Sequence, residues 1–147
     1  MANTRVQVLG KSDVAAVAKL LVLAGLATVL PFFIHLQWLT GPIINAVLIL
    51  ALFLIGIRSA LVLCMVPSLM ALAGGLLPAV LAPVVPFVMI SNAILVLSVD
   101  FFNTRIKGEV NGFWIGVAVG SFSKFIFLFG SVSVIGNLLI KSELTLK

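Results

Sequence analysis

One lysine lies in the middle of an apolar run of the sequence, where an ionised side chain is costly. Lys124 is the only charged residue between Gly112 and Ile140. An ionisable residue at such a depth in a membrane helix marks a functional site by default. A simpler interpretation is that its ammonium extends to the headgroups or bonds free helix-end carbonyls. Lys124 is therefore the first candidate for ligand contact.

Two asparagines in other apolar runs fall near the same predicted depth. A rise of about 1.5 Å per residue places Lys124 roughly 12 Å below the outer surface of a core about 30 Å thick, and Asn92 level with it. Asn45 should lie one turn inside that face. Beside the lysine charge, the asparagine amides would supply directional hydrogen bonds for an acidic or carbonyl-bearing small molecule. We predict a substrate site formed by Asn45, Asn92 and Lys124.

A short segment that combines polar and aromatic residues supplies further candidates. His35, Gln37 and Trp38 occur together between Ile34 and Gly41. This composition is typical of a membrane interface, and it is also expected of a lid over a pocket. Both interpretations stay open, and the three residues are included among the predicted substrate contacts.

The sequence offers few groups for catalysis or metal binding. His35 is the only histidine and Cys64 the only cysteine, and no two carboxylates share an apolar run. Metal ligation and acid-base catalysis therefore lack their usual groups, and no GxxxxGK[ST] loop for a nucleotide phosphate is present. We predict a protein that is not an enzyme and that holds no metal or cofactor. The nine Lys and Arg are scattered singly, which argues against a nucleic-acid interface.

The composition is that of a membrane protein. The chain has 147 residues, 63% hydrophobic and 9% charged, and Arg58 is the only charged residue between Leu20 and Val99. A soluble domain could not cover its surface with so little polarity. Runs such as AVLILALFLIGI lack the alternation of barrel strands. The predicted fold class is all-α, a single polytopic bundle of five transmembrane helices at 14–140 in contact with the lipid bilayer.

The prolines and glycines divide this bundle into elements. A polar segment, 1–13, is expected before the bundle and a tail, 141–147, after it. The expected helices are Val14 to Phe33, Pro42 to Ile57, Ser59 to Ala73, Val84 to Phe102, and one tilted helix from Gly112 to Ile140. Asn103 to Asn111 should form a polar turn. The proline-rich and glycine-rich connection from Gly74 to Pro86 should line protein or a cavity, because broken backbone is not tolerated against lipid.

Basic residues in alternate connections predict the orientation. They are Arg5 with Lys11, Arg58, and Arg105 with Lys107. The positive-inside rule then places the amino terminus in the cytoplasm, in a multi-pass protein of the inner or plasma membrane. Five spans leave Lys141 and Lys147 outside, against the rule.

The ordered series of motifs resembles the substrate-binding S components of energy-coupling factor (ECF) vitamin transporters. The series is GP..N, a glycine and an arginine at a hairpin, VPSLMAL.GGLLP..LAP..PF....N, and SFSKFIFLF, over Gly41 to Phe129. S components are six-helix proteins that bind a vitamin or a related nutrient near the outer face. They hydrolyse no ATP and dock on a transmembrane coupling subunit that carries two ATPases. The resemblance implies a substrate-capture subunit for vitamin uptake with these partners, in which the family's last helix is expected to be missing.

A row of small residues on the first helix predicts where a partner docks. Ala24, Gly25, Ala27 and Thr28 leave a narrow face that another helix can approach closely. We predict docking through Ala24, Ala27 and Thr28. The family's docking helix has alanines four residues apart, whereas here Ala24 is followed four positions later by Thr28.

A function of another class is a non-transporting membrane scaffold or accessory subunit. In that case the polar residues within the apolar runs would serve helix packing alone. A pore is a weaker third hypothesis. The distinguishing feature is whether Asn45, Asn92 and Lys124 meet or face separate neighbours.

Overall fold

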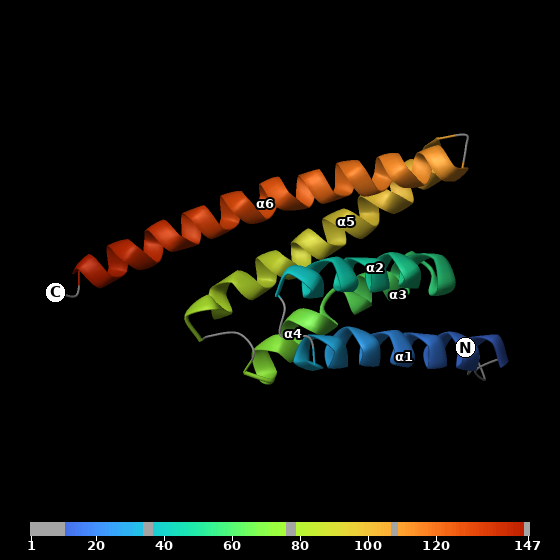
Figure 1. The fold of residues 1–147 in the computed structure, drawn as a ribbon, viewed down its shortest axis with the longest axis horizontal. Helices are drawn as coiled ribbons and strands as arrows, with labels where there is room; N and C mark the ends of the chain where they lie inside the picture. Colours follow the sequence, from blue (N-terminus) through green and yellow to red (C-terminus); the bar gives the residue numbers. More distant parts are fainter. Residues whose placement is uncertain (1–10, 34–36, 76–78, 107–108, 146–147) are drawn as a thin grey trace, which may run out of the picture.

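The chain is all-helical in the residues that the computed structural model describes, which are 11–33, 37–75, 79–106 and 109–145. Side chains are described for 14–29, 40–75, 82–106 and 110–137. Figure 1 shows the elements in order: α1 (Lys11–Phe33), α2 (Gln37–Ile55), α3 (Ile57–Leu63), α4 (Val66–Ala73), a short 3-10 helix η1 (Ala79–Val84), α5 (Val85–Arg105) and α6 (Glu109–Thr145). The predicted all-α class is confirmed for these residues.

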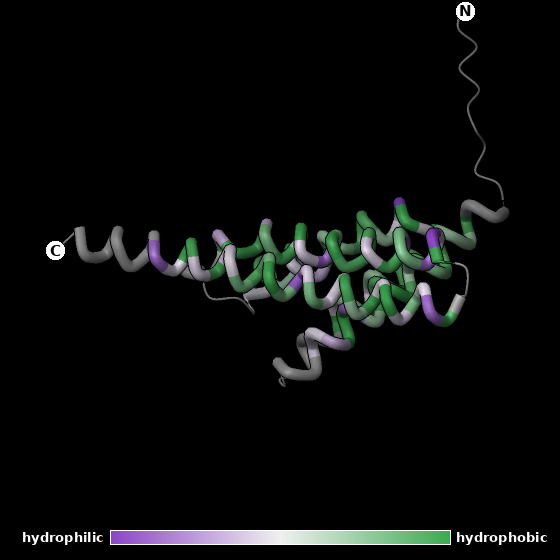
Figure 2. The backbone as a smooth tube through the Cα atoms, turned by 90° about the horizontal axis from the view of Figure 1, so that it is seen from above, coloured by the Kyte–Doolittle hydropathy of each residue, from purple (hydrophilic) through white to green (hydrophobic). Residues whose placement is uncertain are grey.

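Two segments in the described part of the chain are long and apolar enough to cross a membrane, Ala82–Arg105 and Val110–Asn137. Three shorter apolar helical segments accompany them, Val14–Val29, Thr40–Ile55 and Ile57–Ala73. Hydrophobic residues prevail along the whole bundle (Figure 2). By length and composition the two long segments are consistent with membrane association, while the shorter ones leave the number of spans open.

The second helix begins earlier than predicted. α1 ends at Phe33 as expected, but α2 begins at Gln37 rather than at Pro42. Pro42 lies inside the helix, where its missing N–H removes the usual donor to the carbonyl of Trp38. A proline so near the start of a helix breaks a single backbone bond, so the helix continues through it.

The predicted third helix is divided into α3 and α4. α2 and α3 meet at Gly56, whose φ of 100° favours glycine. Arg58 is exposed in the first turn of α3, at the predicted hairpin. α3 ends at Leu63 because Pro67, near the start of α4, has no N–H to donate to the Leu63 carbonyl. The proline therefore produces a break that the sequence analysis did not expect.

The last two helices are longer than predicted. α5 continues to Arg105 and α6 begins at Glu109, so the turn expected from Asn103 to Asn111 is much shorter. α6 is one helix of 37 residues, as expected for its central part, and it also includes most of the predicted tail. At about 1.5 Å per residue it is roughly 55 Å long. Its carboxyl-terminal end extends past the other helices (Figure 1).

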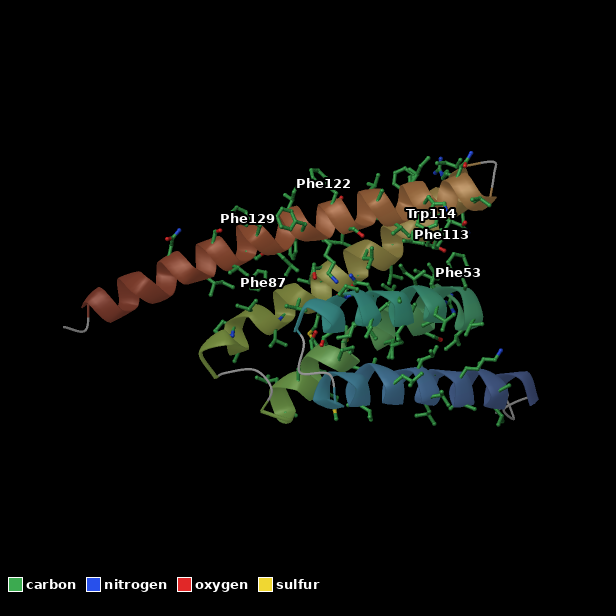
Figure 3. All side chains as sticks on the ribbon, in the orientation of Figure 1. Phe53, Phe87, Phe113, Trp114, Phe122 and Phe129 are labelled. Atoms are coloured by element: carbon green, nitrogen blue, oxygen red, sulfur yellow. The ribbon has the colours of Figure 1, made fainter. Side chains whose placement is uncertain are left out.

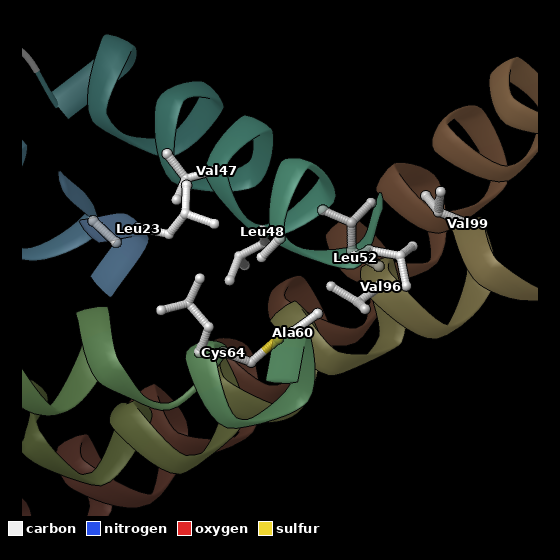
Figure 4. Packing of buried hydrophobic residues seen from close by; sticks show 12 residues of the cluster. Leu23, Val47, Leu48, Leu52, Ala60, Cys64, Val96 and Val99 are labelled. Carbon is white, nitrogen blue, oxygen red and sulfur yellow. The ribbon is translucent and has the colours of Figure 1, made fainter. Parts of the chain in front are cut away.

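The hydrophobic core lies where α1, α2, α3 and α5 meet (Figure 4). Its buried members are Leu23, Ala27, Val47, Leu48, Ala51, Leu52, Ala60, Leu63, Cys64, Leu95, Val96 and Val99. Cys64 is 1% exposed, as is typical of a free cysteine, which packs as a small hydrophobic residue. α6 lies against α5 and contributes Phe113 and Val117 to the margin of this core.

α6 packs against α5 through a row of glycines, Gly112, Gly116 and Gly120, which are all buried. A Cβ atom on Gly116 would lie 2.9 Å from the Cα atom of Val99. A Cβ atom on Gly120 would lie 3.0 Å from Cβ of Ser98. The two helices therefore approach more closely than side chains allow, which is how helices associate in lipid.

Candidate functional site

The glycine row places Lys124 against α5. Lys124 follows Gly120 by four residues, so its side chain leaves α6 on the same face as the three glycines. On the antiparallel helix α5, Leu95 contacts the position of Gly120, and Asn92 lies about one turn further along. The close crossing thus brings the lysine toward the interior of the bundle and toward Asn92.

The ammonium group of Lys124 donates hydrogen bonds to side chains on two other helices. Nζ lies 2.6 Å from Oδ1 of Asn45 in α2 and 2.7 Å from Oδ1 of Asn92 in α5. The three polar side chains singled out in separate apolar runs therefore meet. We call Asn45, Asn92 and Lys124 the Lys124 centre.

Asn92 is held in place at both ends of its amide. It is 3% exposed, and its Nδ2 donates to the backbone carbonyl of Cys64 over 3.4 Å. That carbonyl lies at the junction of α3 and α4, which Pro67 creates. The bond to Cys64 directs the Asn92 oxygen toward Lys124, so the break in the predicted third helix supports the geometry of the centre.

Asn45 has a freer amide than Asn92. Its side chain is half-buried in α2, and its Oδ1 accepts the bond from Lys124. Among the described residues, its Nδ2 donates to no acceptor. Asn45 therefore keeps two N–H groups beside the ammonium of Lys124.

The positive charge of Lys124 is balanced by no carboxylate among the described side chains. Asp100 lies two helical turns from Asn92, about 12 Å along α5. On α6, Glu109 is about 22 Å and Glu143 about 28 Å from Lys124 along the helix axis. Two amide oxygens solvate the ammonium, but they do not neutralise it.

Aromatic pairs lie on both sides of the centre. The rings of Phe87 and Phe127 are 6.3 Å apart, about one turn from Asn92 and Lys124. In the other direction, Phe53 of α2 and Phe113 of α6 are 5.9 Å apart (Figure 3). The nearer pair, Phe87 and Phe127, lowers the local polarity, which strengthens the electrostatic interactions of the ammonium.

The remaining predicted substrate contacts are not brought to the centre by any described contact. His35 lies outside the described residues. Gln37 and Trp38 belong to the first turn of α2 rather than to a loop, and their side chains lie outside the described residues. The role of these three residues stays a prediction.

The predicted docking surface on α1 is corrected at one residue. Ala27 is fully buried in the core formed by this chain's own helices, so it is not accessible to a partner. Ala24 and Thr28 are half-buried, and the Thr28 hydroxyl donates to the Ala24 carbonyl over 2.7 Å. Small residues allow close approach whichever helix supplies the neighbour, and here the neighbours include helices of the same chain.

The residues that position the lysine were not predicted from the sequence. The signal was present as small residues four apart, Gly112, Gly116 and Gly120, with Lys124 next in the same series. Comparison of the chain with protein-family models, curated proteins and solved structures found no match. The resemblance to S components thus rests on the motifs alone.

Proposed function

We propose that this chain is a membrane-embedded substrate-capture subunit that binds a small acidic or carbonyl-bearing molecule at the Lys124 centre. The observation that carries the proposal is the ammonium group of Lys124, bonded to two neutral amide oxygens and to no described carboxylate. In an apolar bundle such a charge is costly unless a further group interacts with it. A substrate that accepts a hydrogen bond from Lys124 would complete its coordination.

The position of the centre suits capture from outside the cell. The amino end of α1, the α2–α3 junction and the carboxyl end of α5 lie at one end of the molecule (right in Figure 1), with exposed Lys19, Arg58 and Arg105 near it. The positive-inside rule assigns that end to the cytoplasm. Lys124 then lies about 22 Å from the cytoplasmic end, in the outer half of a core about 30 Å thick.

Five spans fit this proposal if α3 and α4 cross together as one kinked element. The segment Ile57–Ala73 is apolar over both helices.

On the outside of α6, Trp114, Phe122 and Phe129 are 63%, 65% and 67% exposed (Figure 3). A lipid environment would cover such side chains, whereas water would leave them unfavourably exposed. The proposed protein is a multi-pass protein of the inner or plasma membrane.

The proposal includes an energy-coupling partner, because the sequence has no phosphate loop of its own. As the resemblance to S components implies, we propose a transmembrane coupling subunit that carries two ATPases. The substrate would be a vitamin or a similar scarce nutrient. The chain itself would bind and release it without hydrolysing ATP.

The test compares the small molecules retained by the purified parent protein and by two variants. The parent protein, Lys124→Met and Lys19→Met are purified in mild detergent, and their small molecules are extracted and identified by mass spectrometry. Lys19 is exposed in α1, so Lys19→Met controls for the loss of a lysine. We expect the parent and Lys19→Met to retain the same molecule, and Lys124→Met to retain none while staying monodisperse.

Two results would contradict the proposal. Equal retention by Lys124→Met would make the lysine a packing residue. A parent protein with no retained molecule would favour the alternative, a membrane scaffold or accessory subunit whose polar residues only connect helices.

A further inference from the structure

We infer that the group recognised at the Lys124 centre is an anion, a carboxylate or a similar oxyanion, with Asn45 contacting it and Asn92 acting as a positioning residue. This inference rests on the proposed function and narrows its ligand class. The two asparagines could not be distinguished from the sequence, but they differ in burial and in the N–H groups that a ligand can reach.

The groups at the centre that lack a partner among the described residues and are not fully buried are N–H donors. A lysine ammonium has three N–H groups, and two of them are used on Asn45 and Asn92. The third N–H of Lys124 and the Nδ2 group of Asn45 have no acceptor among the described residues. A ligand group that enters here therefore meets donors, and the two oxygens of a carboxylate can accept from both of them.

Asn92, including the second N–H of its amide, is buried away from a ligand. Its oxygen accepts from Lys124, its nitrogen donates to the Cys64 carbonyl, and its side chain is 3% exposed. Its effect on a ligand passes through Lys124, whose ammonium it holds. Asn45 is half-buried, and among the described residues it is bonded only through its oxygen, so its amide N–H groups can contact the ligand.

Charge distinguishes an anion from a neutral carbonyl. A carbonyl oxygen would satisfy one donor but would leave the positive charge of Lys124 without a counter-ion. The described carboxylate nearest in sequence to the centre, Asp100, is about 12 Å away along α5. A bound anion removes the charge imbalance and adds charge-assisted hydrogen bonds, which are about twice as strong as neutral ones.

The decisive variant is Asn45→Asp, which places a carboxylate of the chain itself beside the ammonium of Lys124. Asn45→Asp keeps the shape of the side chain and the oxygen that lies 2.6 Å from Nζ, and it replaces the free amide donor by a second acceptor. We expect the ligand-free variant to melt about 3 °C or more above the parent, because an internal ion pair replaces an unpaired charge. We also expect it to lose at least 100-fold in retained ligand.

Asn92→Asp is the matched control. It adds the same charge 2.7 Å from Nζ, but its second oxygen replaces the nitrogen that donates to the Cys64 carbonyl. Two oxygens about 3.4 Å apart repel each other where a hydrogen bond existed. We therefore expect Asn92→Asp to melt below Asn45→Asp. An Asn45→Asp protein that melts below the parent would overturn the inference.

Ligand chemistry is tested with matched probes on ligand-free protein. Benzoate and oleate represent a soluble carboxylate and a lipid carboxylate, and benzamide and oleamide are their neutral counterparts. Stabilisation of the parent by either carboxylate and by neither amide, with no such effect in Asn45→Asp, supports the inference, and the effective carboxylate identifies the source. Equal stabilisation by an amide, or none by either carboxylate, overturns it.

The outcomes separate this inference from the proposed function. A neutral molecule that the parent retains and Lys124→Met loses would overturn the anion while leaving substrate capture standing. A parent that retains nothing in the extraction experiment would overturn substrate capture.

Discussion

Replacing Gly116 and Gly120 together by alanine should push α6 away from α5 and weaken the Lys124 centre. The added Cβ atom on Gly116 would lie 2.9 Å from the Cα atom of Val99. Carbon atoms in favourable contact are about 3.5–4.0 Å apart. The helices therefore have to separate by roughly 0.6 Å or more at this crossing. Lys124 lies one turn beyond Gly120, so its bond to Asn92 should lengthen as well.

The size of the effect follows from two opposing contributions. Overpacking costs about 1–3 kcal/mol at each site, whereas alanine favours a helix over glycine by up to about 1 kcal/mol. The double variant should lose about 2 kcal/mol of unfolding free energy, a fall in Tm of about 6 °C for a chain of this length. It should also retain less of the molecule that the parent binds.

Gly130→Ala with Gly136→Ala is the matched control in the same helix. Neither of these glycines has an atom within 4 Å of an added Cβ. Only the gain in helix propensity remains, so the Tm of this control should be unchanged or higher. Circular dichroism in detergent measures both double variants. Equal changes in Tm for the two pairs would refute the role of the glycine row.

Three further predictions concern burial and topology. Ala27→Leu should cost about 1–3 kcal/mol of unfolding free energy, because Ala27 is fully buried. Gly25 has open space around it, so Gly25→Ala should not lower the Tm. Equal Tm values for the two variants would contradict the packing of α1. The Cys64 thiol, 1% exposed, should resist a thiol reagent until the protein unfolds, and rapid labelling of the folded parent would contradict its burial. In a Cys64→Ala background, a cysteine at Ser59 should react with a membrane-impermeant reagent only from the cytoplasm, and cysteines at Gly74 or Thr145 only from outside. Reaction of the Thr145 variant from the cytoplasm alone would change the number of spans.

Composition was sufficient to predict the all-α class and the continuity of α6 over the predicted range. Apolar runs without alternation leave helices as the only way to satisfy the backbone in lipid. Two of the errors in the helix bounds occurred at prolines. Pro42 looked like the first residue of a helix, but the helix begins five residues earlier, because a proline in its early turns removes a single bond. Pro67 lay inside an apolar run that the sequence analysis treated as one helix, yet it divides α3 from α4.

Counting residues along helices was enough to place Lys124 and Asn92 at one depth, since the rise of a helix is fixed. The direction in which each side chain leaves its helix was not available from that count. That direction depends on which faces of α5 and α6 pack together. The row of glycines that precedes Lys124 determines the packed face of α6. The burial of Ala27 within the chain could not be predicted, because a small residue does not indicate whether the neighbouring helix belongs to the same chain.

Substrate binding by Lys124 is tested most directly by an equilibrium binding measurement. The molecule extracted from the parent protein is titrated back into ligand-free parent, Lys19→Met and Lys124→Met. Loss of a charge-assisted hydrogen bond in an apolar site costs about 1.5–3 kcal/mol, and loss of the charge pairing adds to it. We therefore predict that Kd is unchanged in Lys19→Met and at least about 100-fold weaker in Lys124→Met. A Lys124→Met protein that binds within threefold of the parent would contradict the proposed site.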